Sequence, residues 1–160
     1  VEGDMTFAGI VRFLASLVLP AGCISNAEVA AGAAIDQAKL QHQHRIPYSQ
    51  PNTSATSETR VVYVCRGTTG TILSFKAGSI GIAVGAATVT LDLKKNGTTV
   101  LSAVITLDTG NTARVVEAGT LSVTTLVAGD VLEVVTVATA GGGTLPTGLF
   151  AEVTVAEAAA

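Results

Sequence analysis

The run Ala87-Thr-Val-Thr-Leu-Asp-Leu-Lys-Lys-Asn-Gly-Thr98 decides the fold class of this chain. Apolar and polar residues alternate through its first eight positions, which is typical of a strand with one face on a core and one in solvent. The dipeptide Asn96-Gly97 tolerates the positive φ values of a tight primed turn, so it predicts a hairpin. The fold class is therefore expected to be β.

Similar short alternating runs recur along the rest of the chain from residue 59 onward. Turn-forming residues separate them, as in Val127-Ala-Gly-Asp130. Seven or eight such strands predict an all-β fold, specifically a jelly-roll-like β-sandwich over residues 59–160. The other predicted strands cover residues 60–66, 71–76, 99–107, 113–117, 131–137 and 148–155.

Residues 1–22 are expected to form an N-terminal anchoring arm ahead of this β domain. Residues 7–19 are apolar with one charge, Arg12, and the run is shorter than the ~20 residues that a membrane-spanning helix needs. Both faces are apolar at period two, which favours an extended arm between neighbouring molecules, with a helix over residues 7–17 as the alternative. Leu17–Cys23 approaches a lipoprotein signal, but Pro20 stands where that signal has an aliphatic residue.

Residues 23–58 are predicted to be a helical connector followed by a polar hinge. Asn26 is a suitable N-cap, and the Ala-rich run to Leu40 contains few helix breakers. The apolar positions of this helix are too small for a deep independent core, so we expect it to pack against other copies of itself. The hinge is the Pro-, Asn-, Ser- and Thr-rich stretch at residues 50–57.

The composition limits the partners of the chain. Its net charge is −3 and its 9 Lys and Arg residues are scattered, which excludes the clustered basic face that nucleic-acid binding requires. Only 13% of the residues are charged while 48% are hydrophobic, so other copies or a partner are expected to cover part of the surface. Cys23 and Cys65 are too few for a disulfide framework and are expected to be small buried residues, with a bridge or a metal pair as the alternative.

Several short motifs follow one another in a fixed order along almost the whole chain. They are Leu19-Pro20-x-Gly22, Ile24-x-Asn-Ala-x-Val-x-Ala-Gly-Ala-x-Ile-x-x-x-Lys39-Leu40, Gln41-His-Gln-His44, Val61-Val-x-Val-x-Arg-Gly-x-x-Gly70, Asp92-Leu-x-Lys-Asn-Gly97 and Leu126-Val-x-Gly-Asp130. This order resembles a family of bacteriophage virion structural proteins. The resemblance implies a non-enzymatic protein of the particle, commonly a homotrimer. Since no long repeat array is present to build a fibre shaft, a compact knob on an anchoring arm fits better, as in capsid decoration or cement proteins.

His42 and His44 are the only histidines, and they raise the question of a metal site. On an extended backbone the two imidazoles point the same way, and three copies around an axis could gather them in octahedral geometry around a transition metal. The alternative is that they hydrogen-bond across a trimer junction or face solvent. No metal and no other cofactor is therefore predicted, with His42 and His44 as the candidates if one binds.

No residue pattern indicates an enzyme, because the histidines lie far in sequence from any nucleophile and the carboxylates fall in turns or on strand faces. We expect a trimeric decoration protein on the capsid surface of the virion, made in the bacterial cytoplasm, which binds the major capsid protein and stabilises the head. The alternatives are a tail, fibre or collar component, or a knob that binds a host surface glycan. The residues expected to anchor on the shell are Phe7, Ile10, Val11, Phe13, Leu14, Leu17 and Leu19, and those expected in the oligomer connector are Val29, Ile35, Leu40, His42 and His44.

Overall fold

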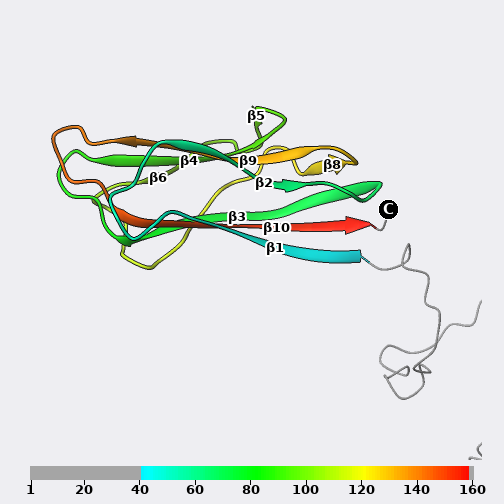
Figure 1. Ribbon diagram of the computed structural model, residues 1–160, viewed down its shortest axis with the longest axis horizontal. Coiled ribbons are helices and arrows are strands. Elements are labelled where there is room, and N and C mark those ends of the chain that lie inside the picture. Colours follow the sequence, from blue (N-terminus) through cyan, green and yellow to red (C-terminus); the bar gives the residue numbers. More distant parts are fainter. Residues whose placement is uncertain (1–40, 159–160) are drawn as a thin grey trace, which may run out of the picture. The chain divides into compact units, whose positions relative to one another are not determined.

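A computed structural model describes residues 41–158 of the chain (Figure 1). These residues form ten strands and no helix. The strands are β1 (Gln41–Ser49), β2 (Glu58–Val64), β3 (Thr69–Gly81), β4 (Thr88–Lys95), β5 (Thr98–Thr99), β6 (Ile105–Leu107), β7 (Glu117–Ala118), β8 (Thr125–Val127), β9 (Val131–Thr139) and β10 (Thr147–Ala158).

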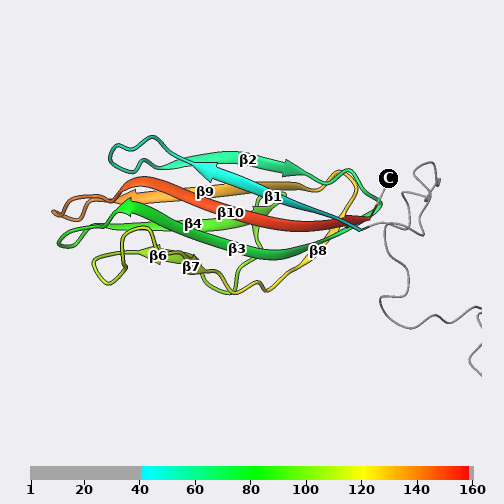
Figure 2. The ribbon, with the colours of Figure 1, turned by 90° about the horizontal axis from the view of Figure 1, so that it is seen from below.

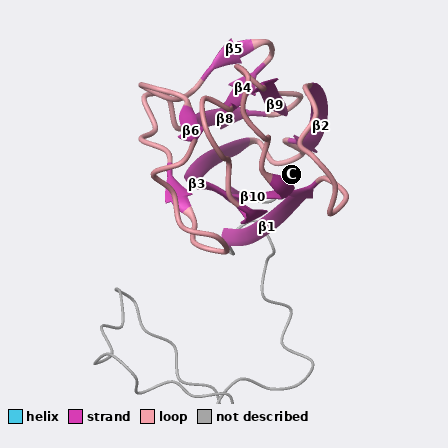
Figure 3. Cartoon of the chain, turned by 90° about the vertical axis from the view of Figure 1, so that its left-hand side faces the viewer, coloured by secondary structure: helices cyan, strands magenta, loops and turns pink. Residues whose placement is uncertain are grey.

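The strands form two antiparallel five-stranded sheets that face each other, as Figures 1 and 3 show. Sheet A has the order β1-β10-β3-β7, and β8 also pairs with β3. Sheet B has the order β2-β9-β4-β5, and β6 also pairs with β4. The predicted all-β class is therefore confirmed. Residues 41–158 contain no helix that is long and apolar enough to cross a membrane.

The core lies between the sheets and follows from the period-two alternation of the longer strands. In β4 the side chains of Val89, Leu91 and Leu93 are buried, while the residues between them are partly exposed. β9 repeats the pattern with buried Leu132 and Val134. Burying each such side chain stabilises the fold by roughly 1.5–3 kcal/mol. The largest fully buried side chains are those of Phe75, Ile72, Leu91, Leu93, Leu107, Leu126, Leu132, Leu149, Val89, Val100, Val134 and Val153.

The predicted hairpin at Asn96-Gly97 is confirmed. Asn96 and Gly97 have φ values of 50° and 82°, and β4 pairs with β5 on either side of them. The single strand predicted over residues 99–107 is wrong, because the chain bends after β5 and resumes as β6. Within the bend, Leu101 bridges to Leu121, which draws this segment away from β4 and towards the chain that precedes β8.

The predicted boundary of the β domain at residue 59 is also wrong. Residues 41–49, assigned to the connector, form strand β1, which pairs with β10 from Gln41↔Ala158 to Ser49↔Phe150. Tyr48 and, within the predicted hinge, Ala55 belong to the hydrophobic core. Ile46 and Tyr48 supply a short period-two signal. Pro47, which cannot donate to a ladder, fits the edge position that β1 occupies in sheet A.

The described chain enters the sandwich at one end, and three of its connections lie at the other end. Because Gln41 pairs with Ala158, the chain enters the sandwich at the end where β10 finishes. The connections after β1, β3 and β9 lie at the opposite end, where Gly81 of β3 pairs with Thr147 of β10. Figure 1 shows the start of β1 on the right, beside the end of β10, and these loops on the left.

Candidate functional site

The predicted anchoring residues and most of the connector residues lie outside the described residues. This applies to Phe7, Ile10, Val11, Phe13, Leu14, Leu17 and Leu19 of the arm, to Val29, Ile35 and Leu40 of the connector, and to Cys23. The predicted arm and connector helix remain expectations. His42 and His44 are placed on β1, so the sheet, not a connector, carries them.

His44 lies near an acidic side chain at the entry end of the sandwich. Its side chain is 46% exposed, its Nε2 is 3.9 Å from Glu157 Oε2, and its ring centroid is 6.0 Å from that of Tyr63. β1 is extended here, which is the backbone that the metal hypothesis requires for a pair at alternate positions. Among residues 41–158 no group of three or more His, Cys, Asp or Glu side chains is arranged to hold a metal.

Glu157 is a buried carboxylate with a structural role. It is 7% exposed, and its Oε1 accepts hydrogen bonds from the backbone N–H groups of Arg66, at 2.8 Å, and Gly67. These bonds join the last strand to the turn between β2 and β3. Because the carboxylate satisfies two backbone donors, it stabilises the end of the sandwich instead of standing free for chemistry.

A polar cluster at the loop end joins both sheets. Tyr48 Oη donates to Glu58 Oε1 at 2.7 Å, and Gln50 Nε2 donates to Tyr48 Oη at 3.0 Å. The hydrogen bond from Tyr48 lowers the pKa of Glu58, and burial raises the pKa of Tyr48. The Arg60 guanidinium lies 5.2 Å from the centroid of the Tyr48 ring, and its Nη2 is 3.0 Å from Glu58 Oε1. These groups satisfy one another, so the cluster fixes the start of β2.

The outer face of sheet A, which faces the viewer in Figure 2, carries a groove of about 450 Å³. It crosses β1, β10 and β3, and the chain just before β7 forms one wall. Its lining combines apolar side chains with one cation and one carboxylate. The lining residues are Pro47, Tyr48, Ser49, Lys76, Val116, Phe150, Ala151 and Glu152.

Phe150 is the partly exposed aromatic side chain of this groove, and a glycine makes room for it. Phe150 pairs with Gly78 of β3. A Cβ at Gly78 would come within 2.8 Å of Phe150 Cζ and 2.7 Å of the Val115 carbonyl oxygen. Arg114 has a φ of 62°, and its N–H donates to the Ser79 carbonyl at 2.8 Å, two residues before Val116 of the groove wall. The Phe150 ring therefore has a defined position on the outer face of sheet A.

The polar residues of the groove lie directly beside this apolar floor. Lys76 of β3 pairs with Glu152 of β10, and Glu152 pairs with Pro47 of β1. One cation and one carboxylate therefore stand next to each other across neighbouring strands. Such an arrangement can position a ligand by hydrogen bonds while Phe150 and Val116 supply apolar contact.

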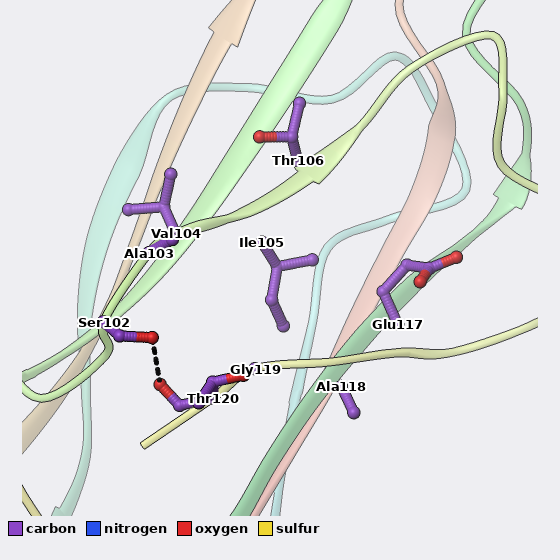
Figure 4. A pocket seen from close by; sticks show the side chains of 9 residues that line it. All are labelled: Ser102, Ala103, Val104, Ile105, Thr106, Glu117, Ala118, Gly119 and Thr120. Carbon is purple, nitrogen blue, oxygen red and sulfur yellow. Dashed lines mark hydrogen bonds between the residues drawn. The ribbon is translucent and has the colours of Figure 1, made fainter. Parts of the chain in front are cut away.

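A second cavity, of about 210 Å³, lies between the free edges of β6 and β7 (Figure 4). At one end of it the Ser102 N–H and Oγ both donate to the Thr120 carbonyl oxygen, at 2.9 and 3.2 Å. At the other end Glu117 accepts a hydrogen bond from Asn111 Nδ2 at 2.9 Å. The polar groups at both ends of this cavity are thus hydrogen-bonded within the fold. The cavity is the gap where the edges of the two sheets separate.

Sequence reasoning missed the groove, although one signal for it was present. In β10 the buried positions are Leu149, Ala151 and Val153, so Phe150 is an aromatic residue on the solvent face of a strand. The partner Gly78 and the wall residue Val116 come from distant segments, and only the register of the sheet brings them to Phe150.

No protein-family model, no curated protein and no solved structure matches this chain. The function is therefore inferred from the residues and the geometry.

Proposed function

We propose that this chain is a non-enzymatic structural protein of a bacteriophage particle, specifically a homotrimeric capsid decoration protein. In this proposal residues 1–22 anchor the chain on the major capsid protein, and the β domain projects from the shell. The observation that carries the proposal is the pairing of Gln41 with Ala158, which sets the entry of the chain at one end of the sandwich. In this proposal the opposite, loop end of the sandwich is the end that faces outward.

The order of the strands supports a jelly roll as the finer description of the sandwich. Along the chain β1 and β3 join sheet A while β2 and β4 join sheet B, and then β9 joins sheet B and β10 joins sheet A. The first and last strands are thus neighbours, as are the second and the second last. Two Greek keys wound into facing sheets have this order, and viral capsid domains are among the proteins that use it.

The proposed mechanism is mechanical. An arm that buries apolar surface across neighbouring shell subunits makes contacts that exist only in the assembled particle. Binding that favours one state stabilises that state by mass action, so the decorated head should resist dissociation better than the bare head. A stable interface of this kind buries roughly 1,200–2,000 Å², which an arm of this length can supply together with the base of a trimer.

The anchoring role is tested with particles assembled without this chain. The full-length chain and a variant lacking residues 1–22 are mixed with such particles and sedimented. We expect the full-length chain to sediment with the particles and the shortened chain to stay in the supernatant. Circular dichroism and sedimentation equilibrium of the shortened chain should still give a folded β oligomer, which separates loss of the anchor from loss of the fold.

Binding of the shortened chain at full occupancy would contradict the arm assignment. Electron microscopy of decorated particles tests the location separately. Density at local threefold positions of the head supports a decoration protein, whereas density only on the tail favours the tail, fibre or collar alternative.

A further inference from the structure

The groove on the outer face of sheet A has the chemistry of a ligand site. We infer that it binds a neutral saccharide unit, whose apolar face packs on Phe150 and whose hydroxyl groups hydrogen-bond to Lys76, Glu152 and Ser49. This inference goes beyond the proposed function, because the proposal assigns particle attachment to residues 1–22, whereas residues of the β domain line the groove.

The position of Phe150 is the first argument. On β10 its neighbours on the same face are Glu152 and Thr154, so it is an aromatic ring beside polar residues of its own strand. The missing side chain at Gly78 lets the ring lie in a defined place against β3. A rigid aromatic surface that stays partly exposed offers apolar contact at little cost in conformational entropy.

The charges of the groove are the second argument. Lys76 and Glu152 are direct cross-strand partners of opposite sign, so the groove has no net charge from its lining. A charged ligand would meet a like charge on one of the two residues. Hydroxyl groups both donate and accept, so a polyhydroxylated neutral ligand can bond to the ammonium and the carboxylate together.

The size of the groove is the third argument. Its volume of about 450 Å³ falls within the range of roughly 300–1,000 Å³ that is typical of small-molecule sites. Pro47 and Val116 stand on either side of Phe150 and bound the apolar floor. A flat ring with one apolar face and polar edges fits an apolar floor that has polar groups beside it. An aliphatic chain would use the apolar floor alone and would form no hydrogen bond with Lys76 or Glu152.

The test is a titration of the full-length ¹⁵N-labelled chain followed by amide chemical shifts. The probes are D-glucose, D-galactose, N-acetyl-D-glucosamine and their short β-linked oligomers. We expect at least one probe to shift amides of β1, β10 and β3 around the groove, with a dissociation constant in the millimolar range or tighter. Phe150→Leu, which keeps an apolar side chain but removes the flat ring, should weaken that binding at least tenfold.

Two further variants keep the test independent of any one substitution. Gly78→Ala should also weaken binding, because its Cβ displaces the ring, and Val137→Ala, on the outer face of sheet B, should leave binding unchanged. Circular dichroism confirms that each variant is folded. Absence of a shift with every probe, or equal binding by the Phe150→Leu variant, would overturn the inference. Preferential binding of an apolar peptide to the groove would also overturn the inference. Phe150→Leu should still sediment with particles, so failure here is separate from failure of the proposed attachment.

Discussion

Asn96, in the turn between β4 and β5, donates a hydrogen bond from Nδ2 to Asp130 Oδ1 at 2.7 Å. The same side chain accepts from the N–H of Val131 at 2.9 Å, and Asp130 Oδ2 accepts from the N–H of Val127 at 3.0 Å. Side-chain hydrogen bonds therefore join the turn between β4 and β5 to the turn between β8 and β9, which is far from it in sequence. Lys95 adds an ammonium 3.5 Å from Asp130 Oδ2, so the carboxylate is buried among partners that favour its charged form.

This arrangement predicts a dependence of stability on Asp130 at acid pH. The hydrogen bond from the Val127 N–H, followed by that from Asn96, lowers the pKa of Asp130. A carboxyl group whose pKa is lower in the folded state contributes stability above its unfolded pKa of about 3.9, and the contribution is lost as pH falls through the folded pKa. Asp130→Asn should therefore reduce the free energy of unfolding at neutral pH by about 1–3 kcal/mol.

Urea denaturation at neutral and acid pH measures this effect. The variant should lose less stability than the wild type on acidification, because it no longer has the group that titrates. Glu133→Gln, on the outer face of β9, is the matched control and should retain the acid dependence of the wild type. An Asp130→Asn variant with the full acid-dependent loss would contradict the assignment.

The two tyrosines should respond in opposite ways to loss of their hydroxyl groups. Tyr48 Oη bonds to both Glu58 and Gln50, so Tyr48→Phe removes two hydrogen bonds from the cluster and should reduce the free energy of unfolding by about 1–3 kcal/mol. Tyr63 Oη is buried and has no hydrogen-bond partner within residues 41–158, so Tyr63→Phe should be neutral or stabilising. Thermal or urea unfolding of the two variants compares them directly, and equal losses would contradict the described cluster.

Tyr48 also predicts the behaviour of the protein at alkaline pH. Burial, and next the hydrogen bond with Glu58, raise its pKa. A tyrosine with a raised folded pKa contributes stability below its unfolded pKa of about 10 and loses it as pH rises through the folded value. In the Tyr63→Phe variant the absorbance titration of Tyr48 should therefore have its midpoint above that of free tyrosine. A midpoint at or below the free value would show that the hydroxyl is solvated.

Gly142 and Gly143 should differ sharply although they are adjacent. A Cβ at Gly143 would collide with the Val84 carbonyl oxygen and come within 2.7 Å of the Ala87 nitrogen. Gly142 has a φ of +85° but open space around it. Gly142→Ala should thus cost about 1 kcal/mol, from the backbone conformation alone. Gly143→Ala should reduce the free energy of unfolding several times more, because the backbone around Val84 and Ala87 must move to admit the Cβ. Melting temperatures of the two variants test this ranking, and equal values would contradict it.

Cys65 should be chemically protected in the folded protein. It is a free thiol, 1% exposed, and burial raises its pKa, so little reactive thiolate is present. In a Cys23→Ser background, labelling of Cys65 by a thiol reagent should be slow in buffer and fast in denaturant. A Thr98→Cys variant in a Cys65→Ser and Cys23→Ser background supplies an exposed reference thiol. Labelling of Cys65 at the rate of that reference would contradict its burial.

Local sequence features predicted the centre of the sandwich but not its edges. The strands β4 and β9 and the Asn96-Gly97 turn follow from alternation and turn chemistry, which depend only on neighbouring residues. β1 has only a short apolar signal at Ile46 and Tyr48, so it looked like part of a polar connector. Its strand conformation comes from pairing with β10, a partner at the other end of the chain.

The candidate site illustrates the same division. The sequence identified His42 and His44 by their residue type and spacing, but it could not show that β1 carries them beside Glu157. It contained Phe150 on the solvent side of a strand, yet the groove exists only because the register sets that ring opposite Gly78 and near Val116.

The sequence by itself determined that this protein is built from strands, where its sharpest turn lies, and that its apolar residues are mainly aliphatic. Those properties are local, since side-chain alternation and backbone preference act over a few residues. Tertiary structure alone decided which strands are neighbours, that Asp130 accepts a hydrogen bond from Asn96, and that a groove forms around Phe150. The reason is physical: contacts between distant segments depend on strand register, and many partners satisfy the same local pattern equally well.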